Sequence, residues 1–246
     1  MLYTRDMYSN VEILTIPEGV EEIEDYCFYN INIGDFTLPT SLRRIGKYSF
    51  FNANITELTL PDYVVELDDS CFAHCYNLQR VTLSKSLKRI NYNAFANTAI
   101  SEIIIPEGCE ILGEGCFAHC FKLSQVILPS SLRKIGSSCF WNTNIRELTI
   151  PEGVSELGNY CFMNCENLQR LSLPSTLTSI GVNNFHNVRE IVLNSFPNEV
   201  LDEHLRNYEG KLTVSKNKIK KNIKVYLFLL STHLLLGYYV YRHYKR

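Results

Sequence analysis

Three short segments of the chain combine cysteine and histidine in a spacing that could bind a metal ion. They span residues 71–75, 116–120 and 161–165, each begins and ends with cysteine, and the first two contain His74 and His119. Thiolate sulfur and imidazole nitrogen are common ligands of Zn²⁺, which usually takes four of them in a tetrahedron. Taken alone, these segments would indicate a metal- or redox-active protein.

The surrounding sequence favours a structural role for the same residues. His74 and His119 occupy a position that is asparagine in most copies of a repeated segment, where a polar side chain can bond backbone groups at a turn. The first cysteine of each segment stands in a column of small residues, where free cysteine behaves as a small buried hydrophobe. Successive segments are separated by two repeats, or roughly 10 Å, so they could not share one ion. We therefore predict no metal ligands and no cofactor.

The number of cysteines also argues for free thiols. There are nine, an odd number, and residues 1–8 have no apolar run typical of a secretory signal, so we expect a reducing compartment. Cys116 and Cys139 stand in the same column of adjacent repeats. We expect this pair to be the one within bridging distance, and it is the bridge to look for if the protein is exposed at a cell surface.

The elements that would hold these residues form a repeat with a period of about 22 to 23 residues, which lies in the range of leucine-rich repeats. Each repeat has an apolar Leu-x-x-Leu-x-Leu pattern, such as Ile145, Leu148 and Ile150, followed in most copies by a proline that ends the strand. One repeat cannot bury its own apolar side, so stacked copies must share a core. The sequence predicts a leucine-rich repeat solenoid of stacked short strands joined by turns or short helical pieces, with eight full repeats and a ninth strand over residues 188–193. The repeat is marked by Phe28, Phe50, Phe72, Phe95, Phe117, Phe140, Phe162 and Phe185.

The residues before each phenylalanine resemble those of a known family. A strand and a proline followed by Ile-Gly-x-x-Cys-Phe, as at residues 135–140, is similar to the BspA-like or Treponema-type leucine-rich repeats. The resemblance extends over residues 11–193. It implies an interaction protein, often at microbial or host-contact surfaces.

Charge divides the chain into an acidic body and a basic tail. Of the 24 Lys and Arg residues, eight lie in residues 216–246, which contain no Asp or Glu, so the remainder holds 16 basic and 26 acidic residues. An acidic body does not suit nucleic acid, which requires a basic stripe. We expect an N-terminal cap over residues 1–10, the solenoid over 11–193, a C-terminal cap over 194–215, a basic linker over 216–224, a transmembrane helix over 225–241 and a basic tail over 242–246.

The segment 225–241 is the candidate membrane anchor and the predicted C-terminal hydrophobic helix. It includes no Asp, Glu, Lys or Arg, and tyrosines and basic residues flank it as at a membrane interface. An interfacial helix and a soluble helix that packs on the body or on a partner are the alternatives. With no signal peptide expected, such an anchor would leave the repeat domain in the cytosol.

The chain shows no pattern typical of an enzyme. The remaining histidines are scattered, no glycine-rich phosphate loop is present, and carboxylate pairs such as Asp68-Asp69 fall in polar connections where we expect them to be solvated. We predict no catalytic residues and no small-molecule substrate.

Three groups of residues are candidates for contact with an unidentified protein partner. Ile104 and Ile127 interrupt a column of threonines on the exposed side of the strands, which indicates either a small binding patch or ordinary strand propensity. The aromatic residues Tyr29, Phe51 and Trp141 follow the phenylalanine column and either contact a partner or cover gaps between repeats. The neighbouring exposed column has nine positions, five of them acidic, and its candidate residues are Glu57, Arg80, Glu102, Gln125, Glu147 and Arg170.

These patterns favour a non-enzymatic protein–protein interaction module, tethered to a membrane by its C-terminal tail. The family resemblance supports the alternative of a surface adhesin or host-contact protein at the cell surface. A metal- or redox-active protein that uses the Cys/His segments is a third hypothesis.

Overall fold

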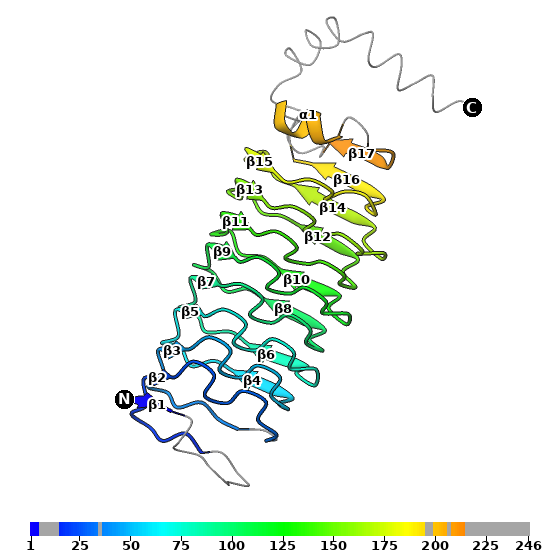
Figure 1. Cartoon of the computed structure of the whole chain (residues 1–246). Coiled ribbons are helices and arrows are strands. Elements are labelled where there is room, and N and C mark those ends of the chain that lie inside the picture. Colours follow the sequence, from blue (N-terminus) through cyan, green and yellow to red (C-terminus); the bar gives the residue numbers. More distant parts are fainter. Residues whose placement is uncertain (5–14, 34–35, 195–198, 206–207, 215–246) are drawn as a thin grey trace, which may run out of the picture.

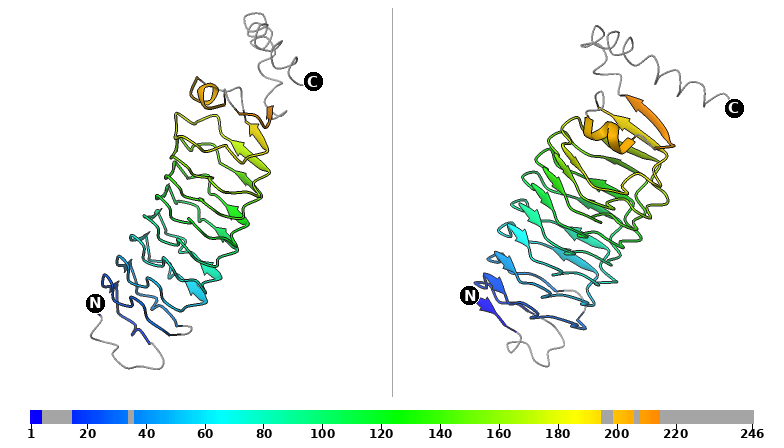
Figure 2. Two further views of the ribbon diagram at one scale, coloured as in Figure 1. Left: turned by 45° about the vertical axis from the view of Figure 1, so that its right-hand side comes forward. Right: turned by 45° about the horizontal axis from the view of Figure 1, so that its top comes forward.

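The computed structural model describes residues 1–4, 15–33, 36–194, 199–205 and 208–214. Within these ranges the chain winds into an elongated solenoid, whose coils stack in sequence order from the N-terminal end to the C-terminal end (Figure 1). The coils contribute strands to two columns on different sides of the solenoid (Figure 2). The predicted solenoid of stacked short strands is therefore confirmed.

Strands of two residues form one of these columns, which we call the short-strand face. They belong to a single nine-stranded sheet. They are β1 (Leu2–Tyr3), β2 (Glu22–Ile23), β3 (Arg44–Ile45), β5 (Glu66–Leu67), β7 (Arg89–Ile90), β9 (Ile111–Leu112), β11 (Lys134–Ile135), β13 (Glu156–Leu157) and β15 (Ser179–Ile180). Strands of three or four residues form the other column, the long-strand face. They are β4 (Glu57–Thr59), β6 (Arg80–Thr82), β8 (Glu102–Ile104), β10 (Gln125–Ile127), β12 (Glu147–Thr149), β14 (Arg170–Leu173), β16 (Glu190–Leu193) and β17 (Lys211–Val214).

Turns lie between proline and phenylalanine as expected, but each of these stretches also contains a strand of the short-strand face, and the described coils contain no helical piece there. Ile135 and Leu157 in this stretch are buried and lie opposite each other in parallel register. Each strand is shorter than one helical turn of about 3.6 residues, and backbone bonds run between coils, as from the Gly136 N–H to the Leu112 oxygen at 2.8 Å. Hydrogen bonding between stacked coils therefore makes this stretch of the chain a strand. In the described residues the only helix is α1 (Glu199–Leu205), which follows the last coil.

The phenylalanines form a continuous stack through the core. From Phe28 to Phe162 the rings are at most 2% exposed, with consecutive centroids 4.8–5.9 Å apart and planes within 26° of parallel. Aromatic pairs at this distance add about 0.5–1.5 kcal/mol each beyond the burial of apolar area. Backbone hydrogen bonds join the same adjacent coils as the stacked rings: the Phe117 N–H donates to the Cys139 oxygen on the next coil at 3.0 Å.

The backbone bends through the left-handed region on both sides of every phenylalanine of the column from Phe28 to Phe162, and before Phe185. Few residues other than glycine adopt a positive φ, and asparagine is among those that tolerate it best. Two residues before the ring, this conformation is adopted by Tyr26, Tyr48, Ser70, Asn93, Gly115, Ser138, Tyr160 and Asn183. Two residues after it, the same is true of Asn30, Asn52, His74, Asn97, His119, Asn142 and Asn164.

From Phe50 onward, coils of two lengths, a longer one and one shorter by a single residue, alternate and divide the long-strand face into separate sheets. The pairs β4–β6, β8–β10 and β12–β14 each span a longer coil and are in parallel register. The shorter coils fall between β6 and β8 and between β10 and β12, where the strands belong to different sheets. The longer coils carry their extra residue between the second cysteine of a segment and the next buried leucine, as in residues 75–78. The long-strand ladder is consequently broken into pairs.

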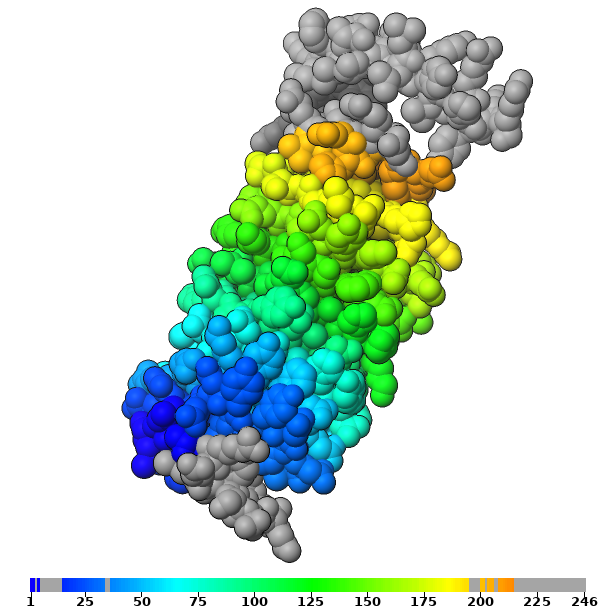
Figure 3. Space-filling model, in the orientation of Figure 1, coloured from blue at the N-terminus to red at the C-terminus, as the bar shows by residue number. Residues whose placement is uncertain are grey.

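A helix and a strand cover the C-terminal end of the solenoid. β17 pairs in parallel with β16, and Leu201 of α1 is buried. In the space-filling view the atoms of these elements lie on the last coils (Figure 3). Both elements lie within the cap expected over residues 194–215. The expected basic linker, transmembrane helix and basic tail over 216–246 lie outside the described residues. Among the helical residues that are described, none belongs to a helix long and apolar enough to cross a bilayer.

Phe117→Ala should lower the free energy of unfolding by about 3–5 kcal/mol, as for other large-to-small core substitutions. The ring is fully buried and stacks on Phe95 and Phe140 at 5.7 and 5.8 Å. Phe28→Ala should cost less, because the end of a repeat array can unfold locally without the rest. Urea unfolding followed by circular dichroism measures both changes. Equal and small losses at the two positions would show that the column is not the core.

Candidate partner-binding surface

The second cysteines of the Cys/His segments point to backbone oxygens of the preceding coil. The thiols of Cys75, Cys120 and Cys165 lie 3.0–3.2 Å from the carbonyl oxygens of the phenylalanines at positions 50, 95 and 140. Burial raises the pKa of Cys75 to about 12 and that of Cys120 to about 11. Because the thiolate is both the metal ligand and the nucleophile, these thiols are poorly suited to either role at neutral pH. In the part of the chain that the structure describes, no group of three or more His, Cys, Asp or Glu side chains could hold a metal ion.

The histidines of these segments occupy left-handed corners with φ of 62° and 59°. The sequence-based explanation was that the polar column bonds backbone groups at a turn, and the structure corrects it. Asn52 contacts Asn30 at 2.8 Å and Asn142 contacts His119 at 3.2 Å across coils, whereas His74 contacts the Tyr76 hydroxyl of its own coil at 2.6 Å. The backbone conformation therefore explains the preference for asparagine. Partial burial, with a smaller effect of the charge on His119, lowers the pKa of His74.

Ile104 and Ile127 form an exposed apolar pair on the long-strand face. They lie opposite each other in the β8–β10 register, and they are 65% and 59% exposed. A hollow of about 440 Å³ lined by β6, β8 and β10 borders both side chains. A second hollow of about 630 Å³ between β10 and β12 borders Ile127 on its other side. The hollows coincide with the two breaks in the long-strand ladder.

Charged side chains surround this pair but do not form a continuous acidic column. Glu57 forms an ion pair with Arg80 on the adjacent strand. The remaining column residues are also exposed, with Glu102 opposite Gln125 and Glu147 opposite Arg170. We call Ile104 and Ile127, together with the neighbouring Glu102, Gln125 and Glu147, the long-strand patch.

The aromatic candidates pack together instead of standing free. Phe51 and Trp141 are half-buried against a column of three buried alanines at positions 73, 96 and 118. Tyr29 stacks on Phe51 at 5.1 Å, and the rings of His74 and His119 lie 4.7 and 4.8 Å from Phe51 and Trp141. The Trp141 indole N–H is buried and has no hydrogen-bond partner among the described residues. This packing supports the interpretation that these aromatics cover gaps between coils.

Several exposed aromatics, among them Tyr76 and Phe121, lie outside the candidates that the sequence indicated. Tyr76 and Phe121 are 59% and 60% exposed, and both directly follow the second cysteine of a segment. They sit where the longer coils carry their extra residue. The alternation between longer and shorter repeats was the signal that could have identified them.

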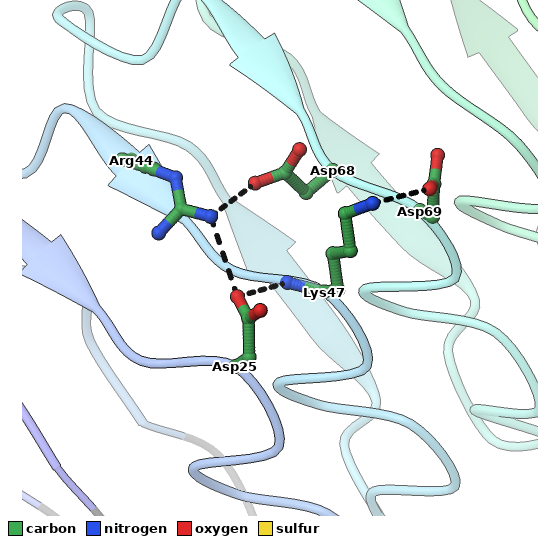
Figure 4. Close-up of polar contacts among 5 residues, drawn as sticks. All are labelled: Asp25, Arg44, Lys47, Asp68 and Asp69. Carbon is green, nitrogen blue, oxygen red and sulfur yellow. Dashed lines mark hydrogen bonds and ion pairs between the residues drawn. The ribbon is translucent and has the colours of Figure 1, made fainter.

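A cluster of ion pairs joins three coils at the N-terminal end of the short-strand face (Figure 4). Arg44 in β3 contacts Asp68 at 2.8 Å and Asp25 at 3.3 Å, and Lys47 contacts Asp69 at 3.0 Å. Only 13% of the Asp68 side chain is exposed. The expectation that Asp68 and Asp69 are simply solvated is therefore wrong, because stacking brings cations of the preceding coil beside them.

The family profile described as BspA type leucine rich repeat region, in six copies, matches residues 7–124 and 88–207. The chain therefore belongs to the BspA-type leucine-rich repeat family. Among solved structures it is similar to a leucine-rich repeat protein of T. pallidum, at 25% identity and a TM-score of 0.56, with 80% of this chain and 81% of that chain covered. A leucine-rich repeat protein from Bacteroides ovatus matches at 22% identity and a TM-score of 0.46, with 85% and 71% covered. A search of curated proteins finds no match.

The double variant His74→Asn, His119→Asn should leave the free energy of unfolding within about 1 kcal/mol of the wild type. Asparagine already occupies the same left-handed corner in other coils, so the backbone loses nothing. Urea unfolding measures the change, and elemental analysis of the purified wild type measures bound metal. Stoichiometric zinc in the wild type that disappears in the double variant would contradict the structural role of these residues.

Proposed function

We propose that this chain is a non-enzymatic module that binds a protein partner through the long-strand patch. The observation that supports it is the pair of adjacent, largely exposed isoleucines at positions where most other coils carry threonine or serine. Threonine suits an exposed strand without an apolar surface, so strand propensity alone does not require isoleucine there. The patch occupies the middle of the array, where coils on both sides support it.

The shape and charge around the pair define the kind of partner. The hollow lined by β6, β8 and β10 can accept an apolar side chain, and burying a side chain the size of leucine contributes about 1.5–3 kcal/mol, whereas the hollow between β10 and β12 has a mainly polar lining. Glu102 and Glu147 stand at the edge, where they would orient a partner that carries basic residues beside an apolar ridge. The partner is therefore a protein surface with apolar anchors and a basic edge.

We also propose that residues 225–241 tether the module to a membrane. An apolar run between basic and aromatic flanks supports this proposal. Membership of the BspA-type family is equally compatible with the alternative of a surface adhesin. Protease added to intact cells separates the two, because it removes the repeat domain only if that domain is outside the cell.

Replacing both isoleucines, as Ile104→Glu and Ile127→Glu, should weaken partner capture by at least about tenfold, since two buried apolar contacts are lost. Affinity capture of a partner from extract, compared between wild type and variant, measures the effect. Sedimentation velocity of both proteins tests whether the partner is a second copy of the chain.

The matched control is Val65→Glu with Val182→Glu. These valines are 47% and 53% exposed and lie outside the long-strand face, so the control changes the same number of exposed apolar residues to the same charge. Capture should survive in the control. Unchanged capture in the isoleucine variant, or equal loss in both variants, would contradict the proposed site.

The full-length protein should sediment with membranes and resist extraction by alkaline carbonate, whereas residues 1–215 alone should remain in the supernatant. A helix over 225–241 would be roughly 25 Å long, and flanking Lys and Arg residues can close the gap to a hydrocarbon core of about 30 Å. Release by high salt would instead show that the basic run binds acidic lipid surfaces. Full-length protein that stays soluble without detergent would contradict the anchor.

A further inference from the structure

Two buried thiols in the core are in direct contact. The sulfurs of Cys116 and Cys139 lie 3.4 Å apart on adjacent coils, and both residues are fully buried. Their backbones are neighbours, since the Phe117 N–H donates to the Cys139 oxygen at 3.0 Å. Adjacent coils about 4.8 Å apart fall within the Cα separation of about 4.4–6.8 Å that disulfides require.

We propose that Cys116 and Cys139 are a site of disulfide formation that closes as the coils pack. A thiol–disulfide oxidant such as oxidised glutathione would supply the chemistry. One cysteine thiolate attacks the oxidant and releases one reduced glutathione; the second thiolate attacks the mixed disulfide and releases another. Two S–H bonds are lost, one S–S bond forms, and two electrons and two protons pass to the oxidant.

The structure distinguishes this pair from a second pair in the same column. Cys161 stands on the coil after Cys139, so sequence position alone would allow a Cys139–Cys161 bridge as well. The expectation that the column holds a single candidate pair is therefore incomplete. The Cys161 thiol points instead to the oxygens of Gly136 and Gly158, at 3.0 and 3.3 Å. Only the pair at 116 and 139 is already oriented sulfur to sulfur.

The depth of the site determines when the bridge can form. Burial raises the pKa of Cys139 well above its usual value, so Cys139 holds little of the reactive thiolate in the folded protein. An oxidant also cannot reach a fully buried sulfur. The bridge should therefore form during folding. In the folded protein, a reduced pair should resist oxidation and a bridged pair should resist reduction. It would join the two coils whose strands, β8 and β10, carry Ile104 and Ile127.

Refolding of the full-length chain in a glutathione redox buffer tests this proposal. The chain is unfolded with guanidinium chloride and reductant, refolded with reduced and oxidised glutathione, alkylated, digested and analysed by mass spectrometry. The expected product is one dominant linked peptide pair, Cys116 with Cys139, with the other cysteines alkylated. Reduced protein that is already folded should stay reduced in the same buffer over the same time.

Two single variants provide the controls. Cys161→Ser removes a buried thiol from the same column and should retain the bridge, whereas Cys139→Ser should abolish linked peptides. Refolded wild type that remains fully reduced, or that links Cys139 with Cys161, would overturn the proposal. If the folded, reduced protein forms the bridge as fast as the refolding chain does, the proposal that the bridge must form during folding is overturned.

Discussion

A single coil of the solenoid cannot bury its own phenylalanine, and the rest of the structure depends on this constraint. Each ring becomes core only when rings of the neighbouring coils cover it, and the stack from Phe28 to Phe162 shows that they do. The backbone must therefore return to the same place once per repeat. Two left-handed corners per coil make that return possible, and they restrict which residues can stand beside the ring.

The features that resembled a metal site are consequences of these corners. Histidine replaces asparagine at a corner, and the two cysteines of a segment lie on either side of a buried ring, with their thiols inside. From the segment at 71–75 onward, the segments alternate with shorter coils in which threonine takes the place of the second cysteine: the Thr98 hydroxyl contacts the Cys120 sulfur at 3.2 Å, and Thr143 contacts Cys165 likewise. This part of the chain thus repeats in units of two coils, one shorter and one longer.

This two-coil unit also shapes the candidate site. Because strands β4 to β14 pair across the longer coils and separate across the shorter ones, β8 and β10 form an isolated pair with a hollow on each side. Ile104 and Ile127 stand together on that pair, in the coils that hold the contacting thiols of Cys116 and Cys139. The proposed partner site and the proposed disulfide are therefore features of the same two coils.

The sequence by itself determined the solenoid, its period, the core columns and the exposed isoleucines, because a strict repeat places the same residue type in the same environment in every coil. The tertiary structure alone decided the second strand column, the breaks in the long-strand ladder, the ion pairs of Asp68 and Asp69, and the direction of each thiol. These features depend on contacts between residues one repeat apart, and an alignment of the repeats does not give the distances between their side chains. Cys139 shows the difference: its column offered two neighbouring cysteines, and only side-chain orientation selected Cys116.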